Sequence, residues 1–228
     1  MKQVLKHIPN AITCCNLISG CIAIMWATRG DFRLALLFIV IGAVFDFFDG
    51  MSARLLHVSS PIGKELDSLA DVVTFGVAPS FMLSSWMKEA CIYDWLFLLP
   101  MLMAAFSALR LAKFNLDERQ AMGFIGLPTP ANALFWGALV TSLSQNPVAY
   151  YFPQLVPILM VVMLVSCYLL VSEIPMFALK FKHWGWKGNE VRYLFLISCV
   201  PLLLFLGIYG ISAIILWYVV LSVVTRKV

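Results

Sequence analysis

The sequence predicts an all-α, polytopic integral membrane protein, a bundle of about eight transmembrane helices with both termini in the cytoplasm. Apolar residues make up 62% of the 228 residues and charged residues 12%, whereas soluble domains are about half apolar and a quarter charged. The mean hydropathy of +0.92 agrees with this class. Apolar stretches of about 20 residues, long enough to cross a bilayer as helices, also recur along the chain.

Eight such stretches follow one another without a long linker or an internal repeat, so we expect one membrane domain over residues 1–228. In order, they are Asn10–Thr28, Phe32–Leu56, Lys64–Trp86, Tyr93–Asn115, Thr129–Ser144, Pro153–Leu179, Arg192–Leu206 and Tyr209–Val224. The first lacks a small-residue cleavage site and is followed by charged residues and another span, which predicts a retained helix rather than a signal peptide. The fifth and seventh are short for a bilayer, and the last two contain few polar residues.

Basic residues are distributed unevenly between the two ends of these spans. An even number of spans puts both termini on one side, which carries thirteen of the sixteen Lys and Arg residues; Arg29, Arg33 and Lys88 are on the other. The positive-inside rule makes the first side cytoplasmic, so we expect the protein in the cell membrane. We interpret the net charge of +4 as this topology signal. A nucleic-acid-binding protein would instead need a basic face on a soluble domain, so we expect no nucleic-acid partner.

The six cysteines show neither a CxxC spacing nor nearby histidines, and five of them fall within the predicted helices. A cysteine in such a position behaves as a small apolar residue. We therefore expect no metal or redox role for them.

Four aspartates lie in two short stretches, Asp46 and Asp49 in DFFDGMSAR and Asp67 and Asp71 in GKELDSLAD. Carboxylates inside long apolar segments are costly, so they indicate a functional site. Within each pair the spacing is three or four residues, which places both carboxylates on one face of their helix. The sequence Ser59-Ser60-Pro61 predicts a tight cytoplasmic turn between the two helices. The helices would then be antiparallel neighbours whose acidic faces meet.

Four carboxylates at close range would repel one another and partly protonate unless cations lay between them. Hard oxygen ligands select Mg²⁺, Mn²⁺ or Ca²⁺ rather than zinc. Two such ions about 3.5–4 Å apart can hold the attacking and leaving oxygens of a phosphoryl displacement. The aspartates therefore predict a site for divalent metal ions and phosphoryl transfer.

Small residues and one arginine accompany the aspartates. Gly50 and Gly63 leave room for a nucleotide or its phosphates to approach the backbone, and the small side chain of Ala53 takes up little of the same space. Arg54 offers a fixed positive charge suited to phosphate. The alternative is that the small residues only permit close packing of helices in lipid.

Written out, the pattern is D-x2-D-G-x2-A-R-x8-G-x3-D-x3-D, from Asp46 to Asp71. It resembles the signature of the CDP-alcohol phosphotransferase family at every defining position. The resemblance implies that Asp46, Asp49 and Asp67 hold two metal ions. It also implies that Asp71 touches the second ion and is the general base on the acceptor hydroxyl.

The same resemblance implies which residues hold the CDP-containing donor. They are Gly50, Ala53, Arg54 and, next to the turn, Ser60 and Gly63, together with Asn10 and Thr13 in the stretch IPNAITCCN. For Asn10 and Thr13 the alternative is helix capping after Pro9. The resemblance further implies a homodimer, because members of the family commonly pair.

Four further stretches are similar to the membrane-type phosphatidylserine synthases of bacteria and archaea, namely FGVAPS (75–80), ALRLAKFN (108–115), GLPTPANA (126–133) and VSEIPMFALK (171–180). The resemblance covers the chain to about Lys187. It implies that CDP-diacylglycerol is the donor, that L-serine is the acceptor, and that phosphatidylserine and CMP are the products.

A serine acceptor needs a cation for its carboxylate. Arg110 and Lys113 lie three residues apart at the cytoplasmic end of the fourth span, and with Asn115 they could form that pocket. The alternative is that these basic residues only anchor the span in the headgroup region. Ser172, Glu173 and Lys180 are weaker candidates, near a possible kink at Pro175 in the sixth span.

Other functions remain open from the sequence. The same chemistry could use another acceptor, such as glycerol 3-phosphate or an inositol compound, although a phosphorylated acceptor would favour more arginines than this chain has. A cation-coupled transporter would usually show repeated halves and a site near the bilayer centre. A purely structural membrane protein would have no reason to keep four costly carboxylates.

Overall fold

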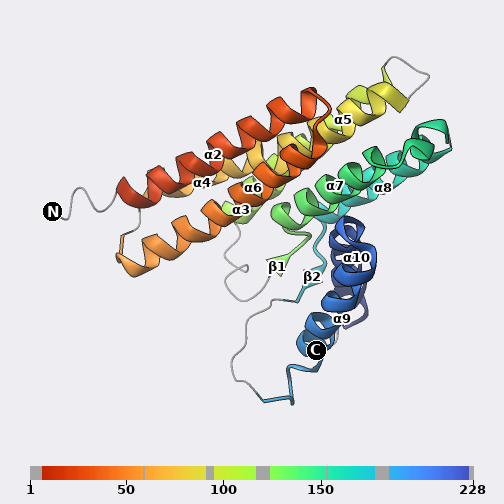
Figure 1. Cartoon of the computed structure of the whole chain (residues 1–228). Coiled ribbons are helices and arrows are strands. Elements are labelled where there is room, and N and C mark those ends of the chain that lie inside the picture. Colours follow the sequence, from red (N-terminus) through yellow and green to blue (C-terminus); the bar gives the residue numbers. More distant parts are fainter. Residues whose placement is uncertain are drawn as a thin grey trace.

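The computed structural model describes residues 7–58, 60–90, 95–116, 124–152, 154–177 and 185–225. These residues are almost entirely helical, as predicted (Figure 1). The predicted positions Ser59, Cys91, Tyr93, Pro153, Leu179 and Lys180 lie outside them.

Helices α2 (His7–Thr28) and α3 (Phe32–Leu55) form an antiparallel pair. Gly30, with φ of +78°, lies in the turn between them. Asp31 then starts α3, because its carboxylate accepts a hydrogen bond of 3.0 Å from the backbone N–H of Leu34. The close pairing depends on small residues: a Cβ added to Gly42 of α3 would come within 3.0 Å of Asn16 Oδ1 of α2.

The next helix is continuous over Pro61–Ala90 and has three parts, α4 (Pro61–Asp71), the π-helical η1 (Val72–Val77) and α5 (Ala78–Ala90). Its start has a capping residue followed by proline: Ser60 Oγ accepts the N–H of Gly63 at 3.0 Å, and Pro61 takes the first helical position. The sequence predicted this helix but gave no indication of the π segment, which begins directly after Asp71.

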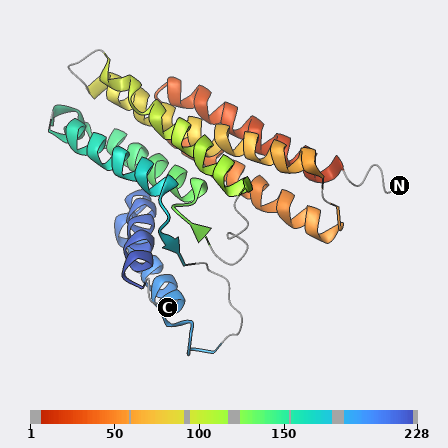
Figure 2. The same cartoon turned by 180° about the vertical axis from the view of Figure 1, so that it is seen from behind.

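Helix α6 (Met101–Leu116) follows the short 3₁₀ helix η2 (Leu96–Leu98). Helix α7 has the predicted bounds, Thr129–Ser144, and is followed by the 3₁₀ helix η4 (Pro147–Tyr151). Helices α2 to α8 run alongside one another in both views (Figures 1 and 2).

Helix α8 (Leu155–Val171) is shorter than the predicted span Pro153–Leu179, which was wrong over residues 172–177. The chain becomes extended at Ser172 and forms strand β2 (Pro175–Met176), antiparallel to β1 (Phe124–Ile125). Pro175 therefore lies in a strand and does not kink a helix. The strand pair is closed by Gly126, whose N–H donates to Ile174 O at 2.8 Å.

The last two helices, α9 (Glu190–Leu206) and α10 (Ile208–Val224), form a hairpin around Gly207, which has φ of +56°. The hairpin crosses the other helices at a steep angle (Figure 1). It is attached through α10, whose Ser212 Oγ donates to Phe135 O of α7 at 2.8 Å.

Four helices of the described chain are long and apolar enough to cross a membrane: His7–Thr28, Phe32–Leu55, Pro61–Ala90 and Leu96–Leu116. Helices α8 and α10 are shorter apolar helices. The helices follow the order of the predicted spans, and the architecture is that of a membrane helical bundle. At one end of it lie the start of α2 and the α3–α4 connection (Figures 1 and 2).

Candidate functional site

The aspartates of α3 and α4 converge at this end of the bundle. Asp46, Asp49 and Asp67 each offer a carboxylate oxygen, and these oxygens lie within 4.8 Å of one another. The predicted meeting of two acidic faces is thus confirmed for these three residues. The helices reach this position differently from the prediction, because α3 and α4 both pack along α2 and have few contacts with each other among the described residues.

The donor set fits a divalent cation. Asp67 Oδ1 is buried without a hydrogen-bond partner among the described residues. Buried polar atoms normally have partners, so an unpaired carboxylate oxygen facing two other carboxylates is what an oxygen-coordinated metal ion would satisfy.

Asp71 lies one helical turn beyond Asp67 and is buried, with 8% of its surface exposed. It is within electrostatic range of Asp46 and Asp67, although it is not part of the three-residue group. Its Oδ1 accepts a hydrogen bond of 3.1 Å from Asn16 Nδ2 of α2. The fourth predicted aspartate is therefore near the other three and is held by α2.

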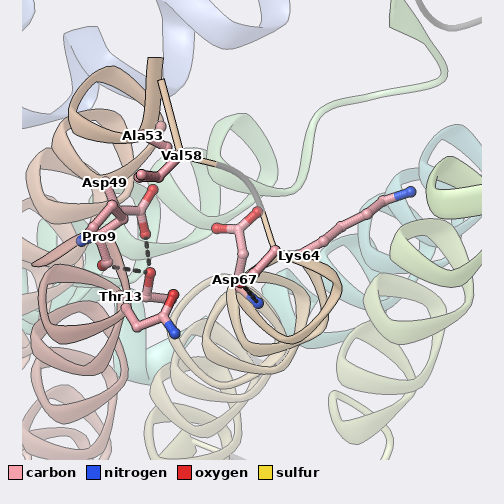
Figure 3. Close-up of a pocket in the computed structure, with 11 residues that line it drawn as sticks. Pro9, Thr13, Asp49, Ala53, Val58, Lys64 and Asp67 are labelled. Carbon is pink, nitrogen blue, oxygen red and sulfur yellow. Dashed lines mark hydrogen bonds between the residues drawn. The ribbon is translucent and has the colours of Figure 1, made fainter. Parts of the chain in front are cut away.

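Helix α2 also supports the α3 carboxylates. Thr13 Oγ1 lies 2.6 Å from Asp49 Oδ2 and 3.0 Å from Pro9 O, as the dashed lines in Figure 3 show. Because α2 is already helical at His7, the alternative that Asn10 and Thr13 only cap the helix is not supported.

A cavity of about 200 Å³ opens between α2, α3 and α4 (Figure 3). The residues that line it are Pro9, Asn10, Thr13, Asp49, Gly50, Ala53, Val58, Ser60, Gly63, Lys64 and Asp67. Six of the seven predicted donor-binding residues are among them. Arg54 is not; it lies on the exposed last turn of α3.

The two motif glycines differ in their surroundings. A Cβ added to Gly50 would meet nothing within 4 Å, so this glycine borders open space and is not a packing contact. A Cβ on Gly63 would come within 3.0 Å of Asn10 Oδ1 and Ser60 Oγ, so close packing does apply there.

The three predicted acceptor residues on α6 have different environments. Arg110 is buried, its Nε has no hydrogen-bond partner among the described residues, and its charge lies within range of Asp71. A guanidinium buried within the bundle does not fit a headgroup anchor. Lys113 is exposed. Asn115 joins α6 to α4, because its Nδ2 donates to Ser68 Oγ at 2.8 Å.

The weaker candidates lie around β2. Ser172 is buried, and its hydroxyl donates to Leu169 O at 3.0 Å. Glu173 is exposed between α8 and β2.

Sequence reasoning missed Asn16, which touches Asp71, and Val58 and Lys64, which line the cavity. In Figure 3 the side chain of Lys64 extends away from Asp49 and Asp67, and its Nζ donates to Asn115 O at 2.9 Å. Asn16 had a usable signal: with Asn10, Thr13 and Ser19 it makes a row of polar residues three apart on a largely apolar helix.

The chain is similar in sequence to a protein family and to several named proteins. The sequence model of the CDP-alcohol phosphatidyltransferase family matches residues 6–172. A Bacillus subtilis protein named CDP-diacylglycerol–serine O-phosphatidyltransferase is 39% identical over 147 residues, covering 63% of this chain and 80% of its own length. Proteins of the same name from Helicobacter pylori strain 26695 and Methanocaldococcus jannaschii are 29% and 34% identical, over 96% and 70% of this chain and 94% and 71% of their own.

Proposed function

The chain belongs to the CDP-alcohol phosphatidyltransferase family, and from that premise we propose that it transfers the phosphatidyl group of CDP-diacylglycerol to the hydroxyl of L-serine. The products are phosphatidylserine and CMP. The observation that carries the proposal is the convergence of the α3 and α4 carboxylates next to a cavity that Gly50, Ala53 and Gly63 of the motif also line. The names of the relatives support serine as the acceptor.

In this proposal Asp46, Asp49, Asp67 and Asp71 hold two divalent cations, Mg²⁺ or Mn²⁺, with Ca²⁺ able to take the same oxygen ligands. The unpaired Oδ1 of Asp67 supports the assignment. When bound, the ions neutralise the pyrophosphate and the charge that develops on the leaving phosphate.

The cavity between α2, α3 and α4 binds the CDP part of the donor. Its wall provides polar side chains at Asn10, Thr13 and Ser60 and open backbone at Gly50 and Gly63. The small side chain of Ala53 leaves space for the donor. Arg54, which lies outside the cavity lining, extends its guanidinium to the donor's phosphates. The acyl chains of the donor stay in the bilayer beside the helices.

Asp71 removes the proton from the serine hydroxyl, and the hydroxyl oxygen attacks the β-phosphorus. A bond forms between that oxygen and phosphorus while the bond from phosphorus to CMP breaks. Arg110 holds the serine carboxylate, which its burial and its proximity to Asp71 support. Lys113 and Asn115, nearer the end of α6, complete the acceptor site at its mouth.

The enzyme lies in the cytoplasmic membrane with this site facing the cytoplasm, where serine is available and the lipid product stays in the bilayer. We also propose a homodimer, by analogy with the family.

The test is transfer by purified protein in detergent, given CDP-diacylglycerol, Mn²⁺ and one labelled alcohol at a time: serine, glycerol 3-phosphate or inositol. We expect labelled phosphatidylserine and an equal amount of CMP, both abolished by a chelator and restored by metal. Preference for another alcohol would contradict the acceptor assignment. CMP release that ignored the chelator would contradict the metal-dependent mechanism.

A further inference from the structure

Asn16 is a polar residue buried in α2, with none of its surface exposed. Its Nδ2 donates to Asp71 Oδ1 at 3.1 Å. Its backbone oxygen accepts a hydrogen bond of 3.0 Å from Thr74 Oγ1 of η1. Its side-chain oxygen, Oδ1, has no hydrogen-bond partner among the described residues.

The unpaired oxygen shows that packing does not explain this residue. Asn16 Oδ1 lies against α3, where a Cβ added to Gly42 would come within 3.0 Å of it. Burying an amide oxygen without a donor is unfavourable, and a leucine would fill similar space without that cost. Rotating the amide would turn its oxygen toward the Asp71 carboxylate, so that two acceptors faced each other. The N–H group is therefore the part of Asn16 that the site uses.

We propose that Asn16 is a positioning residue that fixes the orientation of Asp71. The inference rests on the proposed function, in which Asp71 accepts the proton of the acceptor hydroxyl. Because Asn16 donates to Oδ1, it limits rotation of the carboxylate and so sets the direction in which its oxygens face. Asn16 touches neither substrate and acts through Asp71.

The arrangement of α2 supports this role. One turn earlier on the same helix, Thr13 Oγ1 makes the corresponding contact with Asp49 Oδ2 at 2.6 Å. Since α3 and α4 both pack along α2, one polar face of α2 orients a carboxylate from each of them. Hydrogen-bond partners of this kind set the orientation of metal-binding carboxylates and are needed for full activity.

A purely structural role would use the same hydrogen bond to join α2 to α4, so the variants must separate the two. Asn16→Leu fills similar space without a donor, and Asn16→Asp keeps the shape but replaces the donor with a second carboxylate. Ser19→Ala is the matched control, because Ser19 is buried in α2 beside Gly42 and its hydroxyl donates to Cys15 O at 2.8 Å.

The experiment measures kcat and both KM values from CMP release in detergent, together with the thermal unfolding midpoint. We expect Asn16→Leu to lower kcat about 10- to 100-fold, the range for partners of metal ligands. Both KM values and the unfolding midpoint should stay close to those of the unmodified protein. Asn16→Asp should lose at least as much kcat, and Ser19→Ala should keep the original value.

Unchanged kcat in Asn16→Leu would overturn the inference while leaving the proposed function intact. A lower kcat that is fully accounted for by a lower unfolding midpoint would also overturn the inference. If the unmodified protein released no CMP with any alcohol, the proposed function would fail and this inference with it.

Discussion

The carboxylates of the site differ in their surroundings, and this agrees with the different roles proposed for them. Asp49 accepts from Thr13, Asp71 accepts from Asn16, and Asp67 Oδ1 has no partner among the described residues. The unpaired oxygen belongs to the three-residue group that could hold a metal ion. Asp71 is within electrostatic range both of that group and of Arg110. The proposed reaction needs a base that is near both donor and acceptor.

Replacing Asp71 with asparagine should reduce kcat about 100- to 10,000-fold, the usual contribution of a general base. Asparagine has nearly the same shape, so the protein should stay folded and bind metal, although more weakly. The measurement is serine incorporation alongside thermal unfolding and Mn²⁺ binding. Near-normal incorporation would show that another group takes the proton.

At this scale the sequence predicted most of the site, because spacings of three and four residues already place the aspartates on common helix faces. It could not distinguish Arg110 from Lys113. The two are three residues apart, and only the packing of neighbouring helices leaves the first buried and the second exposed.

Among the helices, α2 organises the site. Its close packing against η1 depends on glycine, since a Cβ on Gly20 would come within 2.8 Å of the backbone Cα of Thr74. Gly50 of α3, in contrast, borders the open cavity. The same substitution should therefore have different effects at the two positions.

Gly20→Ala should destabilise the protein by about 1–3 kcal/mol, the usual cost of overpacking. Gly50→Ala should leave stability unchanged but raise the KM for CDP-diacylglycerol roughly tenfold, the effect of one methyl-sized change in a binding pocket. Thermal unfolding and steady-state kinetics on both variants check this. Equal loss of stability in the two would mean that Gly50 is a packing residue after all.

The elements that sequence reasoning misjudged are those set by tertiary contacts. The end of α8 at Val171 is imposed by pairing between β1 and β2, two segments far apart in the sequence. The π-helical segment Val72–Val77 has ordinary apolar residues and no local signal. A turn at Ser60-Pro61, by contrast, is local chemistry and was predicted, although the helix begins at Pro61 and the predicted span at Lys64.

On the scale of the whole molecule, the proposed topology puts the site in the cytoplasm, by the positive-inside rule. In that topology the turns after α2 and after α7 are on the opposite side of the membrane. Glu65 near the start of α4 and Gln145 after α7 are both exposed and therefore report on the two sides.

Single cysteines at these positions, in a protein whose own cysteines are replaced, should react differently with a membrane-impermeant maleimide. We expect Gln145→Cys to react in right-side-out vesicles and Glu65→Cys to react only in inverted ones. The opposite pattern would put the site on the outer face, away from cytosolic serine.

The most direct measurement is anomalous diffraction from crystals grown with Mn²⁺ and CDP-diacylglycerol. We expect two manganese peaks roughly 3.5–4 Å apart, between the carboxylates of Asp46, Asp49 and Asp67 and next to the donor's phosphates. Manganese bound elsewhere, or these carboxylates turned toward lipid, would contradict the proposed metal site.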